Sequence, residues 1–210
     1  MEEYNEKQLS IILVAERLFA DKGFHGTSVR DIAQEADVNI AMISYYFGSK
    51  EKLLEAVFRL RMEASRVFID ELLKNDTMAP LEKMYSLIDR YINKMLNEQY
   101  FQCIMSREQL NRDKSPVRDL IWQLKREMLG LMEPIITDAQ ADGIFYKDVD
   151  VMLLLTTLFG TINQIIPASL ILRADPEFKD MTEDEFREYL KNRLSTHLKK
   201  LFKAILTHEF

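Results

Sequence analysis

The sequence predicts an all-α fold. Its apolar residues recur at spacings of three and four along almost the whole chain, and the strict alternation of apolar and polar residues that is typical of half-buried strands is absent. Of the 210 residues, 47% are hydrophobic and 30% are charged, with only six glycines and five prolines. This is the composition of a globular protein rich in helix formers, and the length suits one small and one larger domain.

Cysteine and histidine are too sparse for a disulfide framework or a metal site. The single cysteine, Cys103, excludes an internal disulfide, and the three histidines, His25, His197 and His208, give no zinc-binding spacing with it. The acidic start of the chain, MEEYNEKQ, lacks the basic region that a signal peptide carries. We therefore expect a cytoplasmic protein without a metal or cofactor.

The first two helices have clear start and stop signals. Apolar residues at helical spacing predict a helix over about 6–22, and Gly23 stands where a helix commonly ends. Thr27 or Ser28 caps the next helix, because Ser28 and Asp31 have the spacing of a capping box.

A third short helix follows one tight turn later. Asp37 makes that turn, since aspartate tolerates a left-handed backbone better than most residues. The helix spans about 39–47 and ends at Gly48. Ile43 and Phe47 are four residues apart and are expected to face the core. Three short helices with such a turn form a helix-turn-helix unit, in which the third helix enters the major groove of DNA.

Longer helices account for the rest of the chain. A long helix is expected over 50–73, and the polar segment 74–80, which ends in proline, is the best domain boundary. Further helices are predicted over 80–97, 100–112, 116–142, 149–172 and 182–208. Pro134 predicts a kink or a break. We expect a helix-turn-helix domain over 1–50, linked by the long helix to a larger helical domain over 80–210.

The apolar segment 149–172 is long enough to suggest a membrane span. Three residues argue against this interpretation, because Asn163, Gln164 and Pro167 lie together inside it, and no basic residues flank its N-terminal side. We expect other helices of the protein, and no membrane, to cover this segment.

Several short runs of residues in the N-terminal segment form a recognisable pattern: Ile12-Leu13-Val14-Ala15, Leu18-Phe19, Gly23-Phe24, Thr27-Ser28-Val29, Ile32-Ala33, Val38 and Ile43-Ser44-Tyr45-Tyr46-Phe47-Gly48-Ser49-Lys50-Glu51-Lys52-Leu53-Leu54. This pattern resembles the DNA-binding signature of the TetR family of transcriptional regulators. The match covers roughly the first sixty residues, and the rest of the chain resembles the family in helical architecture alone.

The resemblance implies two groups of DNA contacts. Three apolar residues at the head of the third helix are implied to face base edges: Ile40, Ala41 and Met42. Four other residues are implied to contact phosphates: Thr27, Tyr45, Tyr46 and Lys50. The capping residues Ser28 and Asn39, and Ser44, which replaces a phosphate-contacting tyrosine of many members, complete the candidate DNA-binding set.

The charge of the chain limits how it can bind DNA. The net charge is −6, and residues 1–60 hold seven basic against ten acidic residues, although the stretch 38–50 contains no acidic residue. Long-range attraction to phosphates is therefore expected to be weak. The apolar side chains of Ala41 and Met42 offer no hydrogen bonds, and Asn39 is placed to cap the helix, so we predict contacts with thymine methyl groups.

The resemblance also implies a lipophilic ligand inside the larger domain and pairing through the last two helices. Apolar and amide side chains are the candidates for the ligand-binding wall: Phe101, Cys103, Trp122, Met128, Phe159, Asn163 and Gln164. A homodimer is expected on 149–172 and 182–208, with Leu198 and Leu201 on the apolar stripe of the last helix.

The function that these observations favour is that of a repressor released from double-stranded operator DNA by a small lipophilic effector. An enzyme is not expected, because the three histidines are far apart in sequence and no nucleophile, metal cluster or carboxylate pair accompanies them. A helical adaptor that binds only protein is the alternative, supported by the acidic balance of the N-terminal segment.

Overall fold

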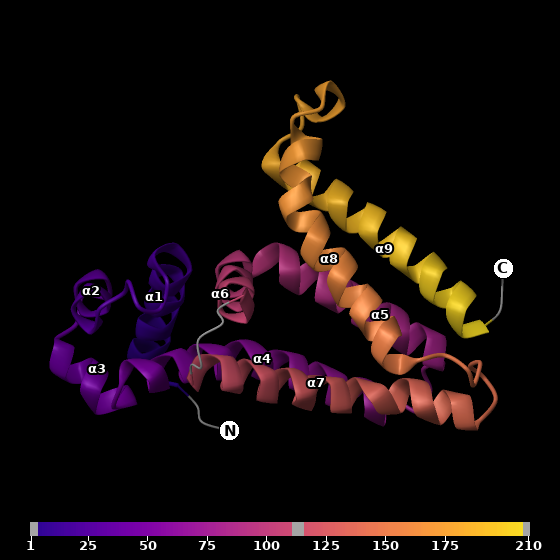
Figure 1. The fold of residues 1–210 in the computed structure, drawn as a ribbon, viewed down its shortest axis with the longest axis horizontal. Helices are drawn as coiled ribbons and strands as arrows, with labels where there is room; N and C mark the ends of the chain where they lie inside the picture. The colour runs from indigo at the N-terminus through magenta and orange to yellow at the C-terminus, as the bar shows by residue number, and fades with distance from the viewer. Residues whose placement is uncertain (1–3, 111–115, 208–210) are drawn as a thin grey trace. The chain divides into compact units, whose positions relative to one another are not determined.

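The computed structural model describes residues 4–110 and 116–207, and these residues form helices with no strand, as the sequence predicts (Figure 1). Short connections join the helices, with one 3-10 turn before the last of them. The elements are α1 Glu6–Lys22, α2 Val29–Glu35, α3 Ile40–Phe47, α4 Lys50–Lys74, α5 Pro80–Asn97, α6 Gln99–Leu110, α7 Pro116–Ala141, α8 Val151–Arg173, η1 Pro176–Phe178 and α9 Glu183–Thr207.

The chain folds into two compact units. The first unit comprises Met1–Val67 and Glu98–Met128, and the second comprises Phe68–Asn97 and Leu129–Phe210. The first unit therefore combines α1, α2, α3 and most of α4 with α6 and the first half of α7, which come from the middle of the chain.

The first unit has its own hydrophobic core. The apolar stripe of α1 buries Ile11, Ile12 and Phe19, and α1 packs against both α2 and α6. Phe58 of α4 and Phe101 of α6 meet edge to face in this core, with ring centroids 5.1 Å apart. Burial of this apolar surface is the main term that stabilises the unit.

A buried ion pair joins α1 to α4 inside the first unit. Glu16 is 2% exposed, and its two carboxylate oxygens accept hydrogen bonds from Nε and Nη2 of Arg61, at 2.6–3.1 Å. A second carboxylate, that of Glu98 just before α6, lies 3.9 Å from Nη1 of Arg61. The hydrogen bonds to Glu16 are the main reason that the pKa of Arg61 is raised.

The second unit is built on α5, α8 and α9, which pack against one another. Asp89 of α5 accepts hydrogen bonds from Ser195 Oγ and Lys199 Nζ of α9, at 2.6 and 2.5 Å. The apolar stripe of α9 is buried at every fourth residue: Phe186, Leu190, Leu194, Leu198, Phe202 and Leu206. Because Leu198 is 0% exposed, it belongs to the core of this unit, and its expected place on a dimer surface is wrong.

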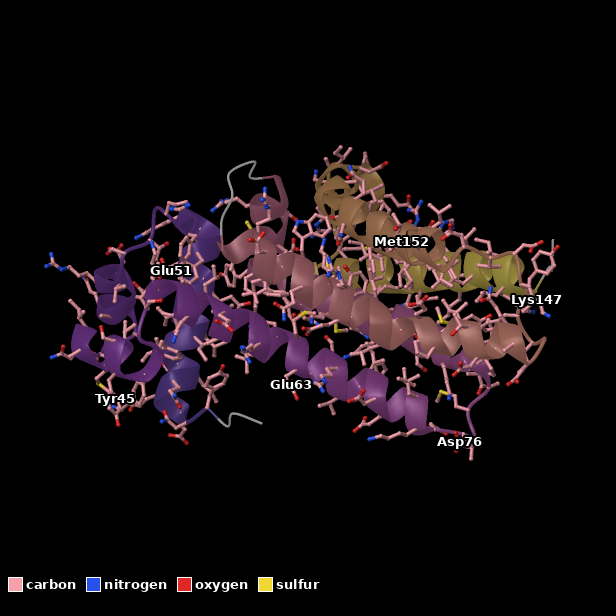
Figure 2. All side chains as sticks on the ribbon, turned by 60° about the horizontal axis from the view of Figure 1, so that its bottom comes forward. Tyr45, Glu51, Glu63, Asp76, Lys147 and Met152 are labelled. Carbon is pink, nitrogen blue, oxygen red and sulfur yellow. The ribbon has the colours of Figure 1, made fainter. Side chains whose placement is uncertain are left out.

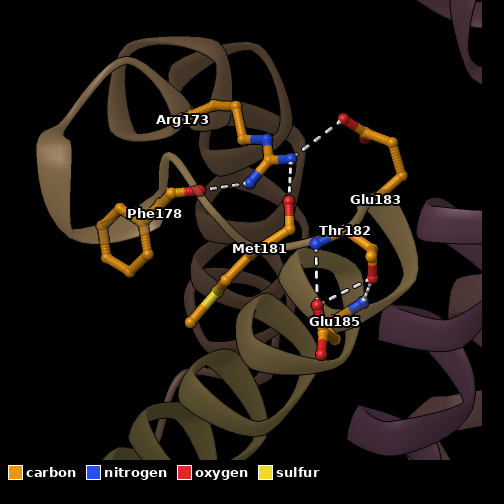
Figure 3. Close-up of polar contacts among 6 residues, drawn as sticks. All are labelled: Arg173, Phe178, Met181, Thr182, Glu183 and Glu185. Carbon is orange, nitrogen blue, oxygen red and sulfur yellow. Dashed lines mark hydrogen bonds and ion pairs between the residues drawn. The ribbon is translucent and has the colours of Figure 1, made fainter.

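The connection between α8 and α9 is folded around one arginine (Figure 3). The guanidinium of Arg173 donates to the backbone carbonyls of Phe178 and Met181 and lies 3.5 Å from a carboxylate oxygen of Glu183. The side chains of Thr182 and Glu185 exchange hydrogen bonds with each other's backbone N–H and so form a capping box at the start of α9.

Helix α7 continues through Pro134, so the break that the sequence allows does not occur. Proline removes the hydrogen bond to the carbonyl of residue i−4, which here is Gly130. Gly130 is exposed, so water can reach the carbonyl that the proline leaves without its helical hydrogen bond. None of the helices in 4–110 and 116–207 is long and apolar enough to cross a membrane.

Candidate nucleic-acid interface

Helices α1 to α3 have the caps and turns that the sequence predicts. Ser28 begins α2, and its hydroxyl accepts a hydrogen bond from the backbone N–H of Asp31. The reciprocal hydrogen bonds from Ser28 lower the pKa of Asp31, the backbone N–H contributing most. Asp37 has φ 51° in the turn between α2 and α3, which confirms the left-handed residue expected there.

Helix α3 buries one face and exposes the opposite one. Ile43 and Phe47 lie in the core of the first unit, as expected. With 3.6 residues per turn, Tyr45 leaves the helix on the side opposite this pair, between Ala41 and Met42. Tyr45 is 83% exposed and projects from the ribbon (Figure 2). The face centred on Tyr45 is therefore the surface that α3 can present to DNA.

The other predicted residues of α3 flank this face. Ile40, Ala41 and Ser44 are exposed, whereas Met42 and Tyr46 are half-buried. The rings of Tyr45 and Tyr46 meet edge to face with centroids 5.3 Å apart. Exposed apolar side chains at the head of the helix suit contact with thymine methyl groups, which stays a prediction.

Asn39 is the N-cap of α3. Its Oδ1 accepts a hydrogen bond of 2.9 Å from the backbone N–H of Ala41, so the capping role expected from the sequence is confirmed. With this oxygen in use, the amide that could read an adenine edge is held at the start of the helix.

Thr27 and Lys50 organise the connection between α1 and α2. Thr27 is 1% exposed, and its hydroxyl donates within the unit, with the carbonyl oxygens of Gly23 and Leu18 at 2.8 and 3.0 Å. Lys50 Nζ donates to the carbonyls of Phe24 and Thr27, both at 2.9 Å, and lies 4.3 Å from the ring centroid of Phe24. The Thr27 side chain is thus not presented to a ligand, and phosphate contact by Lys50 stays a prediction.

A hollow lies beside α3, and no local sequence signal indicates it. Its volume is about 440 Å³, and α1, α3 and α4 of the first unit form its wall. Polar, charged and aromatic side chains line most of it: Tyr4, Gln8, Tyr46, Phe47, Lys52, Glu55, Ala56 and Arg59. Only Tyr46 among these belongs to the candidate DNA-binding set.

The candidate ligand-binding residues are distributed over both units. Four belong to the first unit: Phe101, Cys103, Trp122 and Met128. Phe101 is buried in its core, Cys103 Sγ lies 3.5 Å from the carbonyl oxygen of Ala20, and Trp122 is exposed. These four residues therefore do not share one environment, because Phe101 lies in the core whereas Trp122 faces solvent.

The remaining candidates, Phe159, Asn163 and Gln164, belong to α8 of the second unit. Two of them meet Tyr91 of α5, a residue that the sequence did not single out. The rings of Tyr91 and Phe159 are 4.8 Å apart, and the Tyr91 hydroxyl donates to Asn163 Oδ1 at 3.4 Å. Burial of the Tyr91 hydroxyl raises its pKa. Among the described residues, no group of histidine, cysteine, aspartate and glutamate could hold a metal ion.

Comparison with known proteins extends the resemblance to most of the chain. Residues 11–57 match the family model for bacterial regulatory proteins of the tetR family, and residues 58–190 match the model for the C-terminal region of YsiA-like proteins. The fatty acid metabolism regulator protein of Bacillus subtilis is 26% identical over 79% of this chain and 84% of its own length.

Two further proteins are similar to this chain, one in sequence and one in fold. The transcriptional repressor NicS of Pseudomonas putida is 30% identical over 67% of this chain and 66% of its own length. The transcriptional regulator FadR of Bacillus subtilis, solved in complex with stearoyl-CoA, has a similar fold, with a TM-score of 0.67, 22% identity and coverage of 90% and 96%.

These proteins are regulators by name, and the matched models span both units. An exposed, acid-free helix α3 on a capped three-helix unit is the part of the structure that suits operator binding. The chain belongs to the TetR family of bacterial regulatory proteins and is a ligand-responsive DNA-binding transcriptional repressor.

Proposed function

We propose that the protein is a cytoplasmic, homodimeric repressor that leaves its operator when a fatty acyl thioester binds. The exposed face of α3 carries the DNA-binding part of this proposal, because Tyr45 and its neighbours project from a well-packed unit. DNA binding is assigned to residues 1–50, linkage to 50–73, and ligand binding with dimerisation to 80–210.

The effector class is inferred from similar proteins and from the chemistry of α8. The Bacillus subtilis relative is a fatty acid metabolism regulator, and the FadR structure contains stearoyl-CoA. In this chain Phe159 and Asn163 of α8 meet Tyr91 of α5, so an apolar wall with a hydrogen-bonded amide and phenol is present in the second unit. Such a combination suits a ligand with an acyl chain and a polar head.

The dimer is inferred from the exposed side of α8. Met152, Leu153 and Ile171 are exposed apolar residues on this helix. A Cβ added at Gly160 would meet no atom within 4 Å, so the backbone is open to close approach there. A second copy of α8 would cover this apolar stripe, and a twofold arrangement would present two copies of α3 to successive half-sites.

The test is release of operator DNA by an acyl thioester. An operator is first selected from a random duplex pool with the wild-type protein, and its complex is then titrated with stearoyl-CoA, with coenzyme A alone as the control. We expect stearoyl-CoA to weaken operator binding by roughly 5–150-fold, the usual range of allosteric coupling. Unchanged affinity with acyl chains of every length tested would contradict the proposed effector.

A further inference from the structure

The hollow beside α3 has the chemistry of a site for a phosphodiester. Its lining includes two cationic side chains, those of Lys52 and Arg59, and one carboxylate, that of Glu55. Arg59 and Glu55 form an ion pair one helical turn apart on α4, with Nη2 and Oε1 2.5 Å apart. Hydroxyl and amide groups of the aromatic and glutamine side chains add donors of the kind that bind phosphate oxygens.

The hollow lies next to the face of α3 that is centred on Tyr45. Tyr46 and Phe47 of α3 line it, and the ring of Tyr46 packs against that of Tyr45 at 5.3 Å. The hollow therefore adjoins Tyr45, whose side chain is 83% exposed. When a helix lies in the major groove, the sugar-phosphate backbones run along its two flanks, so the flank that bears Tyr46 is where a phosphate would arrive.

The beginning of α1 adds a favourable electrostatic contribution. Tyr4 and Gln8, which bracket the N-cap Asn5, form the third wall of the hollow. The first turn of a helix carries partial positive charge, which favours an anion nearby. Three helices thus converge on the hollow with donors and net positive charge, although residues 1–60 together hold more acidic than basic residues.

We propose that this hollow seats a backbone phosphate of the bound DNA, with Lys52 as its principal cation and Arg59 as the second. This proposal rests on the proposed function and refines it, since it adds contacts that are independent of base sequence. It also gives an acidic protein a local cationic contact for phosphate, because the wall of the hollow holds two cations and one carboxylate.

The experiment measures the salt dependence of binding to the selected operator and to a random-sequence duplex. Lys52→Gln is compared with Lys74→Gln, a matched control at the other end of α4. We expect Lys52→Gln to weaken binding to both duplexes by about the same factor. The log–log salt slope should flatten by about 0.9 for each phosphate that is no longer neutralised, hence about 1.8 for two reading heads. Lys74→Gln should behave as wild type.

A variant of opposite sign and a modified duplex complete the test. Glu55→Gln removes the carboxylate from the wall and should tighten binding to both duplexes. Methylphosphonate substitution removes the charge of one phosphate of the duplex at a time. At the phosphate that occupies the hollow, this substitution should weaken DNA binding by the wild-type protein but should not weaken DNA binding by Lys52→Gln any further. A wild-type slope for Lys52→Gln, or no tightening by Glu55→Gln, would overturn the proposal while leaving the proposed function standing. If wild type bound neither duplex, both would fall.

Discussion

Replacing Leu153 by glutamate is expected to give a folded monomer that has lost most of its operator affinity. Leu153 is 65% exposed and lies on the apolar stripe of α8 with Met152 and Ile171. A carboxylate there costs little in the isolated chain because water reaches it, but a second copy of the stripe would bury it without a partner. A dimer with two linked helix-turn-helix units binds DNA more tightly than one unit by roughly 10²–10⁴-fold. Loss of the dimer should therefore weaken operator binding by that factor.

Sedimentation velocity and operator titration of the same sample test this expectation. Ile144→Glu is the matched control, because Ile144 is also an exposed apolar residue of the second unit but lies outside α8. Leu198→Glu should behave differently from both and unfold the protein, since Leu198 is fully buried. A Leu153→Glu protein that remains dimeric with wild-type operator affinity would place the dimer surface elsewhere.

Replacing Arg61 by methionine is expected to lower the free energy of unfolding by about 3 kcal/mol, the lower end of the range for breaking a buried ion pair. Glu16 is almost fully buried and depends on Arg61 for its charged hydrogen bonds. Without the guanidinium of Arg61, the carboxylate of Glu16 stays buried and loses the cation that compensates its charge. The carboxylate of Glu98 loses the same nearby cation.

The double variant Glu16→Leu/Arg61→Met should recover most of the lost stability, because it removes the buried charge together with its partner. Urea denaturation measures the stability of the wild type, of Glu16→Leu, of Arg61→Met and of the double variant. All four proteins are compared at one fixed protein concentration, since the stability of a dimer depends on concentration. Equal destabilisation in the single and double variants would show that packing of the two side chains, and not their charge, carries the effect.

Local signals account for how much of the fold could be predicted. Gly23, Ser28, Asn39 and Thr182 each end or begin a helix through hydrogen bonds to residues at most four positions away, so the sequence is enough to place them. The same holds for the inward direction of Ile43 and Phe47, which follows from their spacing alone.

Features that depend on which helices pack together were harder to predict. An apolar stripe looks the same in sequence whether its own unit or a second copy covers it, which is why the pattern assigns Leu198 to a dimer surface. Phe101 and Phe159 look alike in sequence, yet they belong to different units. The hollow draws its lining from three separate helices, so Lys52 and Arg59 carry no signal that distinguishes them from ordinary surface cations.

The central claim is that the exposed face of α3 holds operator DNA, and Ala41→Glu tests it most directly. Ala41 is exposed on this face, so the variant should fold normally, but its carboxylate would meet the electronegative groove and the phosphates. Ala64→Glu on α4, another exposed alanine in a helix, is the control. Fluorescence anisotropy with the selected operator should show at least about a hundredfold weaker binding for Ala41→Glu, of the order expected when a reading contact is replaced by repulsion, and wild-type binding for Ala64→Glu. Equal dissociation constants for Ala41→Glu and wild type would contradict the account.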